Sequence, residues 1–135
     1  MKKQNRRSFL ATIPILSAGL AASAKSPKQE KNQKPIVHHV FFWLKNRGSN
    51  EDLKKLLEGL QTLKKIETVR QIHIGVPAST ELRPVVDASY SASELLFFDD
   101  VAGQNIYQDH PIHQKFIKNC SHLWEKVIVY DSIAV

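Results

Sequence analysis

From residue 36 to the C-terminus, the apolar positions follow two spacings, one typical of strands and one typical of helices. Runs of β-branched and aromatic residues predict strands, whereas apolar residues three and four positions apart predict helices. The predicted elements are strands over 36–45, 69–76, 90–98 and 124–133, a helix from Ser49 or Asn50 to Ile66, a helix from Asp99 or Asp100 through Tyr107, and a helix that begins at Pro111. The order is β-α-β-β-α-β with the second helix broken at His110 and Pro111, which predicts an α+β, ferredoxin-like fold.

Three of the predicted strands are apolar on both faces. A sheet with helices on one face and water on the other alternates apolar and polar residues, but the runs at 40–44, 95–98 and 127–130 do not alternate. Two helical segments can cover only one face of the sheet. An uncovered second face would be an unusually large apolar patch for a monomer, and a second copy packed sheet against sheet would bury it. We therefore expect a homodimer, with a ligand-covered or lipid-facing sheet as the alternative.

The chain has 135 residues, enough for one domain, and its single cysteine excludes an internal disulfide. Its formal charge is +6, but residues 1–24 carry +4 and residues 25–34 carry +3, which leaves the remainder at −1. A nucleic-acid-binding domain needs a basic face on its folded surface, and the remainder of this chain has no such excess. We therefore expect no nucleic-acid partner.

The basic and apolar residues at the N-terminus are typical of an export signal. Arg6 and Arg7 precede an apolar stretch over 9–22, and small residues at Ala22 and Ala24 form a cleavage site. The stretch is too short to span a bilayer, so we expect no stable membrane anchor. The paired arginines resemble a twin-arginine signal, with a general secretory signal as the alternative. We expect a signal peptide over 1–24, a polar flexible linker over 25–35, a domain over 36–135 and a periplasmic location.

Several segments together resemble the stress-responsive dimeric α/β-barrel family. The most specific is the run from Tyr107 to His113 (YQDHPIH), supported by LWEKV at 123–127, VYDS at 129–132, HVFFWLK at 39–45 and RPVVD at 83–87. The resemblance covers nearly all of residues 36–135. It implies a homodimer whose two sheets close into a barrel, which agrees with the expectation drawn from the strands.

The resemblance also implies candidate site residues. In a plant polyketide cyclase of this kind, the catalytic base corresponds to His113, an assisting tyrosine to Tyr107 and a first-strand pocket histidine to His39. The cyclase has a further histidine in its third strand, where this chain has Ala92 or a neighbour. A neutral His113 could take a proton from an enol or phenol while the Tyr107 hydroxyl stabilises the oxyanion. In the alternative, His110 closes the helix break and His113 packs in the core.

Other residues are candidates for binding a ligand. We expect His39, His73, His110 and Trp43 to lie near His113, although aromatic residues such as Trp43 are more often part of a core. The four histidines 39, 73, 110 and 113 could gather around a metal, but their spacing matches no strong metal motif. We therefore predict no metal site and no cofactor.

Three functions remain open at this point. The first is a homodimer that binds a small apolar or aromatic molecule near His113, with acid-base chemistry of the cyclase or lyase type if it is an enzyme. The second is a non-catalytic stress or interaction module. The third is a monooxygenase-like or haem-handling barrel, for which no haem or flavin motif is visible in the sequence.

Overall fold

The computed structural model describes residues 33–135. The expected signal peptide and most of the expected linker lie outside these residues. The elements are β1 (Ile36–Leu44), α1 (Asn50–Thr62), β2 (Gln71–Gly75), β3 (Ala92–Phe98), α2 (Val101–Asp109), α3 (Pro111–Cys120) and β4 (Trp124–Ile133). Short 3-10 helices, Leu63–Lys65 and Ser121–Leu123, follow α1 and α3. No helix of residues 33–135 is long and apolar enough to cross a membrane.

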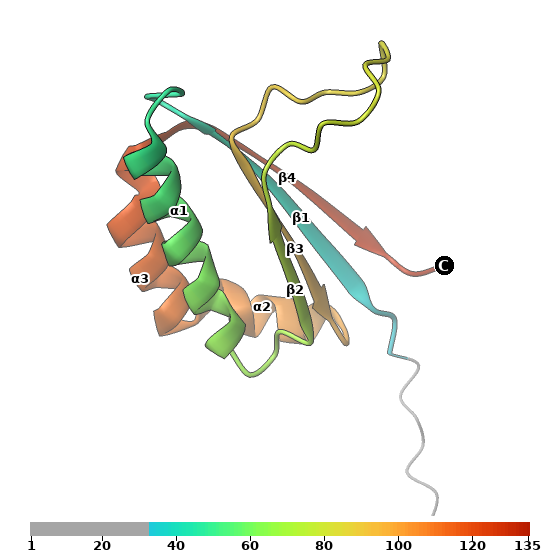
Figure 1. Cartoon of the computed structure of the whole chain (residues 1–135). Helices are drawn as coiled ribbons and strands as arrows, with labels where there is room; N and C mark the ends of the chain where they lie inside the picture. The colour runs from blue at the N-terminus through green and yellow to red at the C-terminus, as the bar shows by residue number, and fades with distance from the viewer. Residues whose placement is uncertain (1–32) are drawn as a thin grey trace, which may run out of the picture.

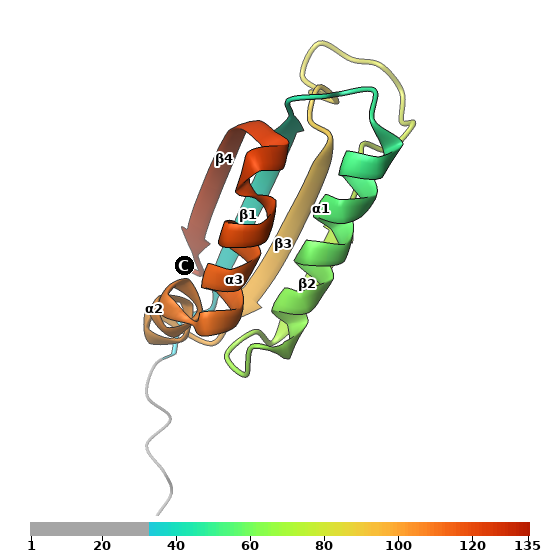
Figure 2. The ribbon, with the colours of Figure 1, turned by 90° about the vertical axis from the view of Figure 1, so that its left-hand side faces the viewer.

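The four strands form one antiparallel sheet in the order β2-β3-β1-β4. The helices of residues 33–135 lie on one side of this sheet, and Figure 2 shows α1 and α3 side by side over it, running roughly along the strands, with β4 at the edge beyond α3. This arrangement is the α+β, ferredoxin-like fold that the element order predicts, with its second helix divided into α2 and α3.

The core lies between the sheet and the helices. Alternate residues of β1, from Ile36 through Val40 and Phe42 to Leu44, point toward the helices and are buried. They pack against Leu56 and Leu60 of α1, against Leu63 of the 3-10 helix that follows it, and against Phe116 and Cys120 of α3. The two helices approach closely at Gly59, where an added Cβ would lie 2.6 Å from the Cys120 Sγ.

Local capping explains where the helices begin. The Ser49 hydroxyl accepts a hydrogen bond from the Asp52 amide at 3.1 Å, and the Asp100 carboxylate accepts one from the Gly103 amide at 2.8 Å. His110 is extended because it precedes Pro111, so it ends α2 and begins α3. Its Nδ1 accepts a hydrogen bond from the Ile112 amide at 3.1 Å. The predicted break in the second helix is therefore confirmed.

The other face of the sheet, which we call the outer face, is not covered by any element of residues 33–135 (Figure 1). Its central residues include Val37, His39 and Phe41 of β1, Leu95 and Phe97 of β3, and Ile128 and Tyr130 of β4. The Phe41 ring lies 4.9 Å from the ring of Tyr90 and 6.1 Å from the ring of Tyr130. The long connection between β2 and β3 leans toward this side in Figure 1. The described domain thus leaves an apolar, aromatic sheet face open.

Candidate functional site

A cavity of about 140 Å³ lies between the helix side of the sheet and α3. Its lining is apolar and aromatic except for four polar residues, His38, Glu94, Gln108 and His113. Val127 and Val129 of β4 also line it, and they are 43% and 46% exposed. Because β4 extends beyond α3, the cavity opens to solvent along this edge of the sheet.

His113 is placed in the cavity wall by the start of α3. Its Nδ1 lies 2.9 Å from the Gln108 backbone oxygen, and a carbonyl can only accept, so Nδ1 carries the proton. In the neutral ring this leaves Nε2 with a free lone pair. Burial lowers the pKa of His113, the bond to the Gln108 carbonyl raises it in part, and nearby His38 lowers it. The side chain is therefore a neutral imidazole at neutral pH, with Nε2 as a hydrogen-bond acceptor.

Tyr107 lies behind His113, outside the cavity lining. Its ring is fully buried and its centroid lies 4.5 Å from that of His113 and 5.7 Å from that of His38. Burial raises the pKa of Tyr107 strongly, and the neighbouring Glu94 carboxyl raises it further. The phenol therefore stays protonated, so that it can donate a hydrogen bond but cannot act as a base.

His38 is the histidine of β1 that enters the cavity. Its Nδ1 donates to the Asp131 carboxylate of β4 at 2.5 Å, and the two residues lie opposite each other in the sheet. This contact fixes the orientation of the His38 ring. The predicted placement of His39 in the pocket is therefore wrong, because side chains alternate along a strand and His39 points to the outer face.

Glu94 is the residue of the site that the sequence did not single out. It lies on β3 between Val40 of β1 and Ile74 of β2, and its side chain points toward the helices with only 2% exposed. Burial raises the pKa of Glu94 to about 8, and the Tyr107 hydroxyl lowers it in part. The hydroxyl and the carboxyl are close enough to affect each other, but they do not meet with the geometry of a full hydrogen bond. The sequence did contain a signal for Glu94, because this acidic residue shares one face of β3 with the apolar residues Leu96 and Phe98.

The remaining predicted ligand-binding residues lie away from His113. His39, His73 and Trp43 are on the outer face, where the Trp43 indole donates to the Ser89 hydroxyl at 3.0 Å and lies under the Lys126 ammonium. His110 caps α3 with Nδ1, and its Nε2 lies 3.2 Å from the Glu67 carboxylate.

The sheet separates His39 and His73 from His113, so the possible gathering of four histidines does not occur. Within the described residues no group of three or more histidine, cysteine or acidic side chains is arranged to hold a metal.

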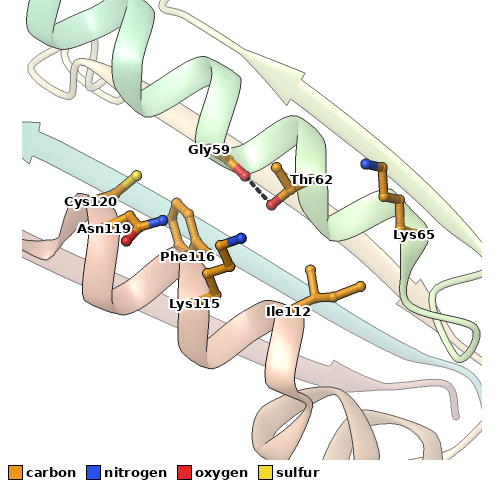
Figure 3. A pocket seen from close by; sticks show the side chains of 8 residues that line it. All are labelled: Gly59, Thr62, Lys65, Ile112, Lys115, Phe116, Asn119 and Cys120. Carbon is orange, nitrogen blue, oxygen red and sulfur yellow. Dashed lines mark hydrogen bonds between the residues drawn. The ribbon is translucent and has the colours of Figure 1, made fainter.

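A second hollow, of about 250 Å³, lies between α1 and α3. Figure 3 shows that Lys65 and Lys115 flank it and that Phe116 and Cys120 lie within it, while Thr62 donates to the Gly59 carbonyl at 2.6 Å. Burial raises the pKa of the Cys120 thiol, which therefore remains a poor nucleophile. This hollow is larger than the cavity beside His113, but it offers no neutral base and no buried acid.

The fold and the site define a ferredoxin-like α+β domain with a histidine-lined cavity between sheet and helix. The sequence matches the family described as Stress responsive A/B Barrel Domain, abbreviated Dabb, over residues 36–134, and the chain belongs to this family. No relative was found among functionally curated proteins.

Solved structures agree with this assignment. A Dabb family protein with a ferredoxin-like fold from Mesorhizobium loti is 26% identical, with a TM-score of 0.63, covering 76% of this chain and 99% of that protein. A dimeric ferredoxin-like protein of unknown function from Thermobifida fusca is 16% identical, with a TM-score of 0.62 and coverages of 76% and 93%. A hydroxynitrile lyase from Passiflora edulis is 20% identical, with a TM-score of 0.61 and coverages of 76% and 95%. The last two likenesses show the fold alone.

Proposed function

We propose that this protein binds a small aromatic or apolar molecule in the cavity beside His113. The observation that carries the proposal is a free imidazole acceptor, Nε2 of His113, in an apolar cavity of about 140 Å³ that is open at the β4 edge. An apolar cavity of roughly 150 Å³ accommodates a benzene ring, so a single ring fits this volume. A few polar groups in an apolar lining are the usual composition of a small-molecule site.

The same geometry provides acid-base chemistry for a suitable ligand. His113 Nε2 can accept a proton from a phenol, an enol or an acidic carbon within hydrogen-bond distance. Tyr107 stays protonated and packs on the His113 ring, so it positions the imidazole. A reaction of the cyclase or lyase type would begin with this proton transfer.

Ligand binding can be tested with a panel of single-ring compounds, measured by thermal shift and calorimetry. We expect a neutral ring compound to stabilise the wild-type protein, and we expect His113→Ala to reduce its affinity about tenfold, as one lost hydrogen bond would. His122→Ala is the control, because His122 is exposed and should leave binding unchanged. If no ring compound binds, or if His113→Ala binds as well as wild type, the proposal fails and the interaction-module hypothesis is favoured.

The haem-handling alternative has its own test. A purified protein that absorbs visible light, or that takes up haem with a defined absorption band, would support that alternative and contradict the cavity proposal. We expect a colourless protein whose spectrum is unchanged by added haem. The reason is size, because the cavity that His38 and His113 line has a volume of about 140 Å³, which fits one ring and not a haem macrocycle.

We also propose that two copies pack through their outer faces. The support is an uncovered sheet face with apolar and aromatic residues on three strands, together with relatives such as the Thermobifida fusca protein that are described as dimeric. A second copy would remove these side chains from water without changing the cavity, which lies on the opposite side of the sheet.

Export is a separate proposal, supported by the paired arginines and the apolar stretch of residues 1–24. Fused to a reporter that folds before transport, this segment should direct periplasmic accumulation. Replacing Arg6 and Arg7 by lysine should abolish transport by the twin-arginine route. Unchanged transport in a host that lacks this route would favour the general secretory alternative.

A further inference from the structure

Glu94 is an acidic side chain buried without a cationic partner. It is 2% exposed, and no Lys, Arg or His of residues 33–135 forms an ion pair with it. Its Oε2 is fully buried and has no hydrogen-bond partner within the described domain. Ionising an unpaired carboxyl in such a place costs several kcal/mol, so the neutral acid is the form that the fold accommodates.

A neutral carboxyl brings a hydrogen-bond donor to this position. The groups that face Glu94 are Tyr107 from α2 and, around the same cavity, His38 from β1 and His113 from α3. The neighbouring residue on β2 is Ile74, and α1 contributes leucines, so no further titratable side chain faces it. Glu94 lines the cavity and Tyr107 does not, so Glu94 is the acid that a bound molecule meets.

We propose that Glu94 determines the specificity of the cavity, by donating a hydrogen bond to the oxygen of a neutral phenol or enol whose own proton faces Nε2 of His113. The inference rests on the proposed function and names its ligand class. A hydroxyl oxygen both donates and accepts, so a single ligand atom satisfies the imidazole and the carboxyl together. A carboxylate ligand is rejected, because an unpaired anion would lose its hydration beside Glu94 and the apolar lining.

Three matched ring compounds test this inference by calorimetry: phenol, toluene and benzoate. Near pH 6 we expect phenol to bind wild type about tenfold more tightly than toluene, the size of one or two neutral hydrogen bonds, and we expect benzoate not to bind. In Glu94→Leu the preference for phenol over toluene should disappear. In Glu94→Gln it should remain, because the amide still donates.

The pH dependence gives a second readout that does not need the leucine variant to fold. Burial raises the pKa of Glu94 to about 8, so phenol affinity of wild type should fall several-fold between about pH 6 and about pH 9. Glu94→Gln should keep its affinity over this interval.

The outcomes separate the two proposals. Phenol preference that is the same in wild type and Glu94→Leu, or a pH profile shared by wild type and Glu94→Gln, overturns the role of Glu94 and leaves the cavity in place. If none of the three compounds binds wild type, both proposals fail.

Discussion

At the scale of single residues, burial acts on an acid and a base in opposite directions. The same apolar surroundings raise the pKa of Glu94 to about 8 and lower the pKa of His113, so both groups are neutral near pH 7. A neutral acid on the sheet and a neutral base on α3, lining one cavity, can donate to and accept from one ligand. Neither group would have these properties on the surface of the protein.

The burial of Glu94 predicts how stability depends on pH. The pKa of Glu94 in the folded protein, about 8, lies above its ordinary value of 4.5. The free energy of unfolding is therefore unaffected by Glu94 ionisation below about pH 4.5, and it decreases as the pH rises toward 8. We expect Glu94→Gln to unfold at about the same denaturant concentration as wild type near pH 4. Near pH 9 it should be more stable, by up to about 5 kcal/mol.

Urea unfolding at both pH values measures this difference. Glu81→Gln, at an exposed position on the connection between β2 and β3, controls for the general loss of a charge. Equal stability of Glu94→Gln and wild type near pH 9 would mean that Glu94 ionises there without cost.

The positions of His38 and Glu94 show how far the site could be predicted from the sequence. Alternation along β1 predicts that His38 and His39 face opposite sides, but the strand is apolar on both sides. The sequence therefore does not identify the side that faces the helices, and His39 was wrongly placed in the pocket. The same ambiguity concealed Glu94, whose burial depends on how β3 pairs with β1 and β2.

At the scale of elements, the break between α2 and α3 positions the base. His110 accepts from the Ile112 amide, and its Nε2 lies 3.2 Å from the Glu67 carboxylate, so it fixes the first turn of α3, from which His113 enters the cavity. Pro111 and the capping positions made this break predictable from the sequence. The contact between His113 and the Gln108 carbonyl was not predictable, because it depends on the angle between the two helices.

Substitution of His110 tests this assignment. His110→Ala should lower the free energy of unfolding by about 1 kcal/mol, because the Ile112 amide loses its cap. His110→Asn should restore most of the loss, since asparagine is a good capping residue. Denaturant unfolding measures the stability, and calorimetry with phenol measures binding. If His110→Asn is stable but no longer binds phenol, His110 is a ligand-binding residue rather than a cap.

At the scale of the whole molecule, the sheet separates two surfaces with different roles. The helix side encloses the core and the cavity, and the outer face presents aromatic and aliphatic side chains that include Phe41 and Leu95. The lack of alternation in the strands predicts this second apolar face from the sequence alone. Covering it with a second copy would give the domain more buried surface than about 100 residues can bury alone.

The dimer proposal predicts the effect of a charge on the outer face. Phe41→Glu should produce a monomer at micromolar concentration, because an unpaired carboxylate cannot be buried against an apolar partner. Leu82→Glu is the matched control, since Leu82 is 89% exposed on the connection between β2 and β3. Sedimentation velocity distinguishes the two species. A wild-type protein that sediments as a monomer, or a Phe41→Glu protein that stays dimeric, would contradict the proposal.

The central claim is that His113 presents a neutral imidazole with a free Nε2 to a ligand in the cavity. Nitrogen NMR of the histidine rings, recorded near pH 7 with and without phenol, tests it most directly. We predict a ring protonated at Nδ1 alone, whose Nε2 resonance shifts when phenol binds. A proton on Nε2, a doubly protonated ring, or a resonance that phenol leaves unchanged would contradict the account.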